Sequence, residues 1–269
     1  MGAAAGSAAC LAAVIRNNIR YDSLRILEST YGVSLRELYL FADRTYTADD
    51  GMDASEKAIS VILFKLEGQT ILRHPNWQMD DRLLLEHIDP KLGVCHVDGQ
   101  DRAMRTRDFP TVDPADPYAL SPEEQEVMDG LVDAVTSSEK LRRHVNFLYE
   151  RGSAYLVHND IVLFHACVPM NPDGTFCAVN HQGKMLAGRE YYDYADRLAR
   201  RAWHEHDQVS LDWMWYLWCG RLSPLSGRVI KTFERTYFTD ESTWKEPRDP
   251  YFALVNDPEV CRSILREFG

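Results

Sequence analysis

His165 is the residue whose type and position best suit a functional role such as metal binding. It directly follows the apolar run Ile161–Phe164, and small residues and Pro169 come after it. In α/β folds, functional side chains gather just beyond the carboxyl ends of buried strands. A neutral imidazole at such a place can bind a metal ion when an acceptor holds its other ring nitrogen. The pattern by itself leaves two interpretations open: a metal ligand, or a histidine whose polar atoms are satisfied in the core.

A second group of candidate residues lies in the segment that starts at Cys219. It holds four cations, Arg221, Arg228, Lys231 and Arg235. The guanidinium fork of arginine matches the oxygens of phosphate, so a loop of this composition could bind a phosphorylated substrate. Solvated surface cations are the alternative explanation, and the spacing does not decide between the two.

Two further groups are weaker candidates. His204 and His206 are separated by one residue, which is the wrong spacing for a shared helical face that could hold a metal. The three tryptophans of residues 211–218 could stack on a sugar. That segment is apolar on nearly all sides, however, which is typical of a buried helix. We therefore expect these tryptophans in the core.

The elements that position the candidates follow from apolar periodicity. Residues 151–269 are expected to start with a tight strand pair at 154–157 and 161–164 and to continue with helices and the cation-bearing loop. The second strand shows no alternation, which predicts that both of its faces are covered. Other helices are predicted at residues 3–28, after the Ser34 and Glu37 capping-box pattern, and at about 55–68, 80–88, 138–151, 187–206 and 257–268.

Residues 1–150 are expected to be mostly helical, with one small hairpin around residues 94–97. Residues 108–122 hold four prolines, which disfavour both helix and central strand. This segment is predicted to be an ordered extended crossing, with a domain boundary as the alternative. Ser121 and Pro122, followed by two glutamates, predict the start of a helix.

The composition is that of a folded protein, with 269 residues, 45% hydrophobic and 26% charged. The formal net charge of -11 repels nucleic acid and anionic lipid, so neither is an expected partner. Six scattered cysteines without a C-x-x-C pair predict reduced thiols in a cytoplasmic protein. No apolar run is long enough to span a bilayer, and the first residues lack the positive region of a signal peptide.

Long phrases of the sequence resemble a known family. The phrase GSAYLVHNDIVLFHACVPMNPDGTF is similar to the segment of class III (Firmicutes-type) fructose-1,6-bisphosphatases in which a strand delivers a histidine. It also resembles the strand-histidine element of calcineurin-like metallophosphatases. Further matches, in chain order, are KLEGQTILRHPNWQMDDRLLLEHID, FPTVDPADPYALSPEE, SEKLRRHVNFLYERGS, DWMWYLWCGRLSPLSG and KTFERTYF. They run through nearly the whole chain.

The resemblance implies a gluconeogenic phosphatase that removes the 1-phosphate of fructose 1,6-bisphosphate with a hydroxide held by two manganese ions. His165 would bind one of these ions, and Cys167 would then be a core residue and not a nucleophile. The implied partner is a small sugar bisphosphate, and homo-oligomers are compatible with it. The implied fold is α/β, a partial metallophosphoesterase-type sandwich with a mixed sheet, flanking helices and a large helical insertion.

The sequence departs from the family pattern at the metal ligands. The family's other ligand motifs, Gly-Asp-x-x-Asp-Arg-Gly, Gly-Asn-His-Asp and a late Gly-His, do not occur here. One histidine cannot hold two metal ions, so residues 1–269 are expected to form one incomplete metallophosphatase domain that is inactive alone. The chain would be either an internal fragment of an intact enzyme or a non-catalytic regulatory or interaction module that kept the scaffold.

Overall fold

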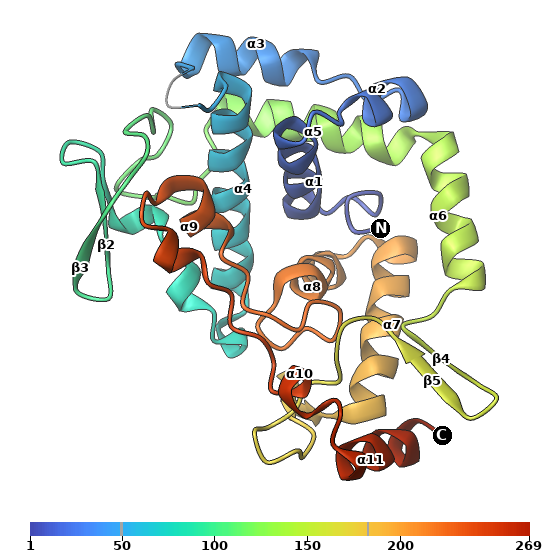
Figure 1. Ribbon diagram of the computed structural model, residues 1–269. Helices are drawn as coiled ribbons and strands as arrows, with labels where there is room; N and C mark the ends of the chain where they lie inside the picture. The colour runs from blue at the N-terminus through green and yellow to red at the C-terminus, as the bar shows by residue number, and fades with distance from the viewer. Residues whose placement is uncertain (49–50, 182) are drawn as a thin grey trace. The chain divides into compact units, whose positions relative to one another are not determined.

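The computed structural model describes residues 1–48, 51–181 and 183–269, and Figure 1 shows the path of the chain. The described residues are α/β as predicted, mainly helical, with small antiparallel sheets and no mixed sheet among them. They divide into two compact units. Unit 1 comprises Met1–Val145 and Lys231–Lys245, and unit 2 comprises Asn146–Ile230 and Glu246–Gly269. The sequence predicted one incomplete domain with a mostly helical region at residues 1–150; unit 1 holds most of that region and residues 231–245 as well.

Unit 1 is built around α4 (Ala54–Arg73), which is buried on nearly all sides. Helices α1 (Ala8–Arg20) and α3 (Arg36–Thr45) pack against it (Figure 1). A helix without an exposed polar stripe is a central element, because each of its faces must be covered. The other helices with residues in this unit are α2 (Arg25–Tyr31), α5 (Pro122–Ser137), α9 (Thr232–Tyr237) and the first part of α6 (Glu139–Arg151).

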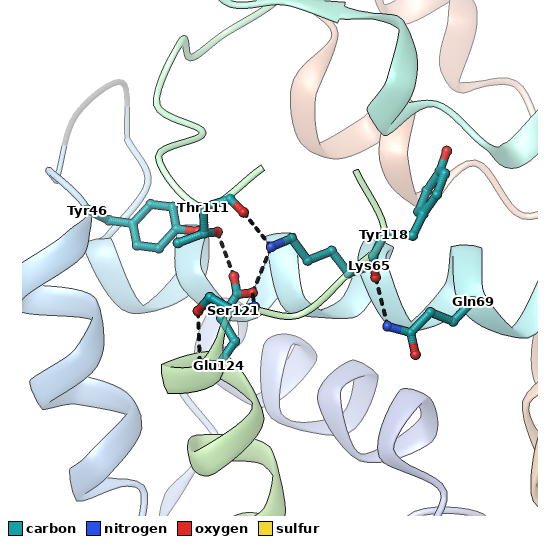
Figure 2. A network of polar contacts seen from close by, with 7 residues as sticks. All are labelled: Tyr46, Lys65, Gln69, Thr111, Tyr118, Ser121 and Glu124. Atoms are coloured by element: carbon teal, nitrogen blue, oxygen red, sulfur yellow. Dashed lines mark hydrogen bonds and ion pairs between the residues drawn. The ribbon is translucent and has the colours of Figure 1, made fainter. Parts of the chain in front are cut away.

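Buried Lys65 of α4 holds the proline-rich crossing in place (Figure 2). Its Nζ donates to the carbonyl oxygen of Thr111 at 2.6 Å and to Glu124 Oε2 at 2.7 Å. The same carboxylate accepts from the Ser121 backbone N–H at 2.7 Å, and Ser121 Oγ accepts from the Glu124 N–H at 3.2 Å. This reciprocal pair is the capping box that starts α5.

The crossing is ordered, as predicted, but it consists of successive turns and is not extended: the N–H groups of Val112, Asp116 and Ala119 donate to carbonyl oxygens three residues earlier. Its later part is fixed by Gln69, whose Nε2 donates to the Tyr118 carbonyl oxygen at 2.7 Å (Figure 2). The whole of residues 108–122 lies within unit 1, so the alternative of a domain boundary there is wrong. The carbonyl groups of Thr111 and Tyr118 have no partner in a helix or strand. They accept hydrogen bonds from the side chains of Lys65 and Gln69 on α4 instead.

Three helix predictions in unit 1 need correction. The helix predicted at 3–28 is interrupted after Arg20, where Asp22 takes a positive φ of 50°. The capping box predicted at Ser34 is absent, because the N-cap is Leu35 and the carboxylate of Glu37 pairs with Arg36 at 2.8 Å. The helix predicted at 80–88 forms only short 3-10 turns, η2 (Asp80–Arg82) and η3 (Leu85–His87), after η1 (Pro75–Trp77).

The small hairpin of unit 1 is confirmed. β2 (Val94–Val97) pairs with β3 (Gln100–Ala103) across a turn at Asp98 and Gly99, and β1 (Ile88–Asp89) adds to the other edge of β2. Both turn residues have positive φ, 52° and 69°, which asparagine, aspartate and glycine tolerate best. A 3-10 turn, η4 (Glu241–Trp244), follows α9 in this unit.

Unit 2 is organised by the helix pair α7 (Gly188–Glu205) and α8 (Gln208–Cys219). α8 starts at an N-cap, Asp207, whose side chain accepts from the Ser210 N–H. Trp213 and Trp215 are fully buried, as expected for a core helix, whereas Trp218 is 37% exposed, so the prediction was wrong for the third tryptophan. The remaining elements are β4 (Tyr155–His158), β5 (Ile161–Phe164), β6 (Val179–His181), β7 (Lys184–Leu186), α10 (Tyr251–Leu254) and α11 (Pro258–Phe268). Within the described ranges, no helix is both long and apolar enough to cross a bilayer.

Candidate functional site

His165 stands at the end of an antiparallel hairpin in unit 2. β4 and β5 pair in register from Tyr155 opposite Phe164 to the turn, where Asn159 and Asp160 have φ of 49° and 60°. Two successive residues with positive φ form the type I′ turn whose twist suits a hairpin. The strand pair is therefore confirmed, with β4 one residue later than predicted.

The backbone after β5 is held by the hydroxyl of Tyr192 on α7. This hydroxyl lies 2.8 Å from the carbonyl oxygen of Cys167 and 3.3 Å from those of His165 and Pro224. Ala166 between them has a φ of 62°, an uncommon conformation for a residue with a side chain. The Cys167 N–H donates to the Pro224 carbonyl oxygen at 3.3 Å. The chain beyond His165 is thus bound to two other segments of the unit.

The residues after His165 enter the core of unit 2. Cys167, Val168 and Met170 are buried in a cluster completed by Tyr192, Tyr251, Val260, Ile264 and Phe268. Asp249 supports this loop, since its Oδ1 accepts from the Met170 N–H at 3.1 Å and the Tyr251 N–H at 2.9 Å. Burial raises the pKa of the Cys167 thiol to about 12. A thiol with that pKa is protonated at neutral pH and is no nucleophile, which agrees with the core role expected for Cys167.

The side chain of His165 is exposed at the surface of unit 2. Among the residues that the structure describes, no group of three or more His, Cys, Asp or Glu side chains could hold a metal ion. A single imidazole does not satisfy the coordination of manganese, which takes mainly oxygen ligands in octahedral geometry. The described residues therefore do not form a manganese centre by themselves, and the role of His165 as a ligand stays a prediction.

The two faces of the hairpin differ, which corrects the prediction that both are covered. Tyr155, Val162 and Phe164 pack on the core cluster of unit 2. The opposite face carries Leu156, Ile161 and Leu163, with exposed fractions of 54%, 57% and 54%. Among the described strands, β4 and β5 pair only with each other. An unalternating strand usually means burial on both sides, and here one of the two faces is exposed.

A groove of about 600 Å³ runs beside β4 and was not foreseen from the sequence. Its walls are β4, the α7 residues Arg189, Asp193 and Arg197, and the chain end at Phe268 and Gly269. The Tyr155 hydroxyl donates to Asp193 Oδ1 at 2.9 Å, and Arg189 Nε lies 3.8 Å from Asp193 Oδ2. No local pattern predicts this groove, because its walls come from three separate segments.

The four predicted phosphate-binding cations are divided between the two units. Arg221 and Arg228 belong to unit 2, whereas Lys231 and Arg235 belong to unit 1. Arg228 lies 3.4 Å from Glu246, Lys231 lies 2.7 Å from Glu234, and Arg235 donates to the Trp244 carbonyl oxygen at 3.2 Å. Arg221 and Arg228 are exposed. Each of these residues stays a candidate for phosphate binding on its own.

Comparison with known proteins gives one consistent result. The family model described as Firmicute fructose-1,6-bisphosphatase matches residues 1–269. Curated relatives named fructose-1,6-bisphosphatase class 3 include those of Listeria innocua (40% identical over 295 residues), Lacticaseibacillus casei (41% over 291) and Clostridium tetani (39% over 293). Each match covers 100% of this chain but only 44–45% of the relative. No solved structure matches significantly.

Proposed function

Because the chain belongs to the Firmicute fructose-1,6-bisphosphatase family, we propose that it is part of a phosphatase that removes the 1-phosphate of fructose 1,6-bisphosphate. The observation that carries the proposal is the match of residues 1–269 to that family and to relatives about 40% identical. The chain spans less than half the length of those relatives. The proposal therefore concerns the protein with the additional polypeptide, not residues 1–269 alone.

Within that protein, His165 is the proposed ligand of a manganese ion, and the other ligands come from outside this chain. This assignment is supported by the hydrogen bonds that hold the backbone after His165: the Tyr192 hydroxyl donates to the Cys167 carbonyl oxygen, and Asp249 accepts from the Met170 N–H. Bound manganese would supply Lewis-acid activation of the phosphate ester and of water. This chain's contribution is to hold one imidazole at the exposed end of a strand that is anchored in a packed core.

The same proposal extends to the substrate and the fold. Arg221, Arg228, Lys231 and Arg235 are proposed contacts for the phosphate groups of the sugar bisphosphate. The hairpin is proposed to belong to a metallophosphoesterase-type sandwich, and unit 1 to be its helical insertion. All six cysteines are free thiols, which is compatible with a cytoplasmic enzyme.

A chimera tests the activity directly. Residues 1–269 replace the matching region of the Listeria innocua relative, and release of phosphate from fructose 1,6-bisphosphate is measured with Mn²⁺. We expect activity that His165→Ala lowers by at least about 100-fold, since loss of a supporting residue alone costs 10- to 100-fold at metal sites. His204→Ala is the matched control, an exposed histidine on α7 of the same unit, and should stay within about twofold. An inactive but folded chimera would contradict the proposal, and unchanged activity in His165→Ala would remove the ligand assignment.

A further inference from the structure

Two arginines of unit 2 lie directly opposite each other on neighbouring extended segments. Arg228 and Arg248 form an isolated antiparallel bridge. The backbone hydrogen bonds that flank the bridge, each 2.9 Å long, run from the Val229 N–H to the Pro247 carbonyl oxygen and from the Asp249 N–H to the Gly227 carbonyl oxygen. The arginines are therefore a non-hydrogen-bonded pair, the kind in which opposite residues of antiparallel strands come closest.

This placement of two cations is unfavourable for folding, because like charges directly opposite each other on paired strands repel. Arg228 Nη1 lies 3.4 Å from Glu246 Oε2, and the Arg228 side chain is 46% exposed. Arg248 is also exposed and has no carboxylate partner among the described residues; its Cζ lies 5.6 Å from the centre of the Phe252 ring. One carboxylate for two guanidinium groups leaves a local positive charge on a chain whose net charge is -11.

The bridge packs against the turn that follows His165. Gly227, next to the first arginine, has a φ of 63°, and a Cβ there would lie only 2.9 Å from Cys167 Sγ. Asp249, next to the second arginine, accepts a hydrogen bond from the Met170 N–H at 3.1 Å. Both segments of the bridge thus contact the turn, which fixes the arginine pair relative to the proposed manganese ligand.

We propose that Arg228 and Arg248 together bind the phosphate group that stays on the sugar during hydrolysis. This inference rests on the proposed function, in which the phosphate that is removed meets the metal ions. The other phosphate then needs cations from the protein, and two guanidinium forks side by side suit its oxygens. Arg248 lies beyond the cation-bearing segment selected from the sequence, and only the bridge brings it beside Arg228.

Binding of fructose 6-phosphate tests the pair without relying on activity, because this probe carries the remaining phosphate alone. Its affinity for the Listeria innocua chimera is measured by titration calorimetry. We expect Arg228→Gln and Arg248→Gln each to weaken binding by at least about tenfold, since hydrogen bonds to charged groups are strong. Arg262→Gln is the matched control, an exposed arginine of α11 in the same unit, and should stay within about twofold. Equal affinities in all four proteins would overturn the proposal.

A double-mutant cycle shows whether the two arginines bind one group. If they share a phosphate, the loss in Arg228→Gln/Arg248→Gln should be smaller than the product of the two single losses. Losses that simply multiply would show independent effects and contradict a shared site.

A structural role for Arg248, through its contact with Phe252, is the competing explanation. Arg248→Lys keeps the charge but lacks the planar fork. We expect it to keep the urea midpoint of the 269-residue chain and still to weaken fructose 6-phosphate binding by at least about threefold. A lower midpoint with unchanged binding would assign Arg248 a structural role and overturn the proposal.

Kinetics of the chimera distinguish the two phosphates of the substrate. Arg248→Gln should raise KM for fructose 1,6-bisphosphate by at least about tenfold and leave kcat within about twofold, because contacts with a group that does not react are equal in the ground and transition states. A lower kcat with unchanged KM would place the pair on the phosphate that is removed. Binding of fructose 6-phosphate that needs both arginines, in a chimera without phosphatase activity, would support the pair and reject the proposed function. Phosphatase activity that neither substitution changes would do the reverse.

Discussion

The Nζ atom of Lys65 lies 2.7 Å from Oε2 of Glu124, and both side chains are fully buried, each with 0% exposure. The carboxylate accepts two further hydrogen bonds, because Thr111 Oγ1 donates to Oε1 at 2.6 Å and the Ser121 N–H donates to Oε2. A buried ion pair is tolerated when hydrogen bonds satisfy the remaining lone pairs and protons. This pair joins α4, the proline-rich crossing and the start of α5.

Lys65→Met should lower the free energy of unfolding by about 3–5 kcal/mol, because it leaves the Glu124 carboxylate buried without its cation. Adding Glu124→Gln to that variant should restore part of the loss, since the amide is neutral. Lys57→Met is the control: Lys57 pairs at 3.4 Å with Asp108, which is 22% exposed and can be solvated. Urea unfolding followed by tryptophan fluorescence measures all three. A loss in Lys65→Met no larger than in Lys57→Met would contradict the role of the pair.

Two glycines in helices should respond in opposite directions to alanine. A Cβ at Gly68 in α4 would lie 2.0 Å from Cδ1 of Tyr118, so the ring and the crossing must move. A Cβ at Gly130 in α5 meets no atom within 4 Å. Gly68→Ala should therefore destabilise by about 1–3 kcal/mol, and Gly130→Ala should stabilise by about 0.4–1 kcal/mol. The change in melting temperature of each variant gives the direction of its effect on stability. A higher melting temperature for Gly68→Ala would show that Tyr118 of the crossing does not pack against α4 at this position.

The stability of the chain should fall as pH rises above about 9. Burial raises the pKa of the Cys167 thiol from its ordinary 9.0 to about 12, and of the Tyr216 hydroxyl from 10.0 to about 12. Between those values the unfolded chain has lost the proton and the folded chain keeps it. The folded state then binds more protons, so the free energy of unfolding decreases with pH, by at most about 1.4 kcal/mol per pH unit for each group.

Cys167→Ala isolates one contribution to this alkaline slope. It removes the titrating thiol, so the free energy of unfolding should fall less steeply between about pH 9 and 11 than in the unsubstituted chain. Val168→Ala creates a neighbouring cavity in the same cluster without removing a titrating group, and its slope should match the unsubstituted chain. Urea unfolding at several pH values measures the slopes, and parallel slopes for all three proteins would argue against a buried, protonated Cys167.

Tyr192→Phe should loosen the turn that follows His165. The hydroxyl donates to the Cys167 carbonyl oxygen at 2.8 Å in a buried place, and losing such a bond costs about 1–3 kcal/mol. Tyr194→Phe is the control, since its hydroxyl makes no hydrogen bond to a described residue. Urea midpoints compare the two variants, and amide exchange at residues 165–168 should quicken only in Tyr192→Phe. Unchanged exchange there would show that packing alone holds the turn.

The family, the strand pair and the start of α5 were determined by the sequence itself. They depend on residues that are close in the chain: the turn at Asn159 and Asp160, the Ser121 and Glu124 capping box, and long collinear phrases. The same holds for α8, whose residues 211–218 are apolar on nearly all sides and mostly buried. Short-range patterns of this kind fix the local backbone conformation through residues that are neighbours in the chain. Contacts with distant segments therefore have little effect on that conformation.

Only the tertiary structure decided what covers each face. Ile161–Phe164 predicts burial on both sides, yet Ile161 and Leu163 are more than half exposed, and among the described strands only β4 pairs with β5. The four cations are close in sequence but divide between the two units at residue 231. A lysine such as Lys65 is usually a surface residue of a helix. It is buried here because it forms an ion pair with Glu124, which is 59 positions away in the sequence. Burial and pairing depend on contacts between distant segments, and no local pattern contains that information.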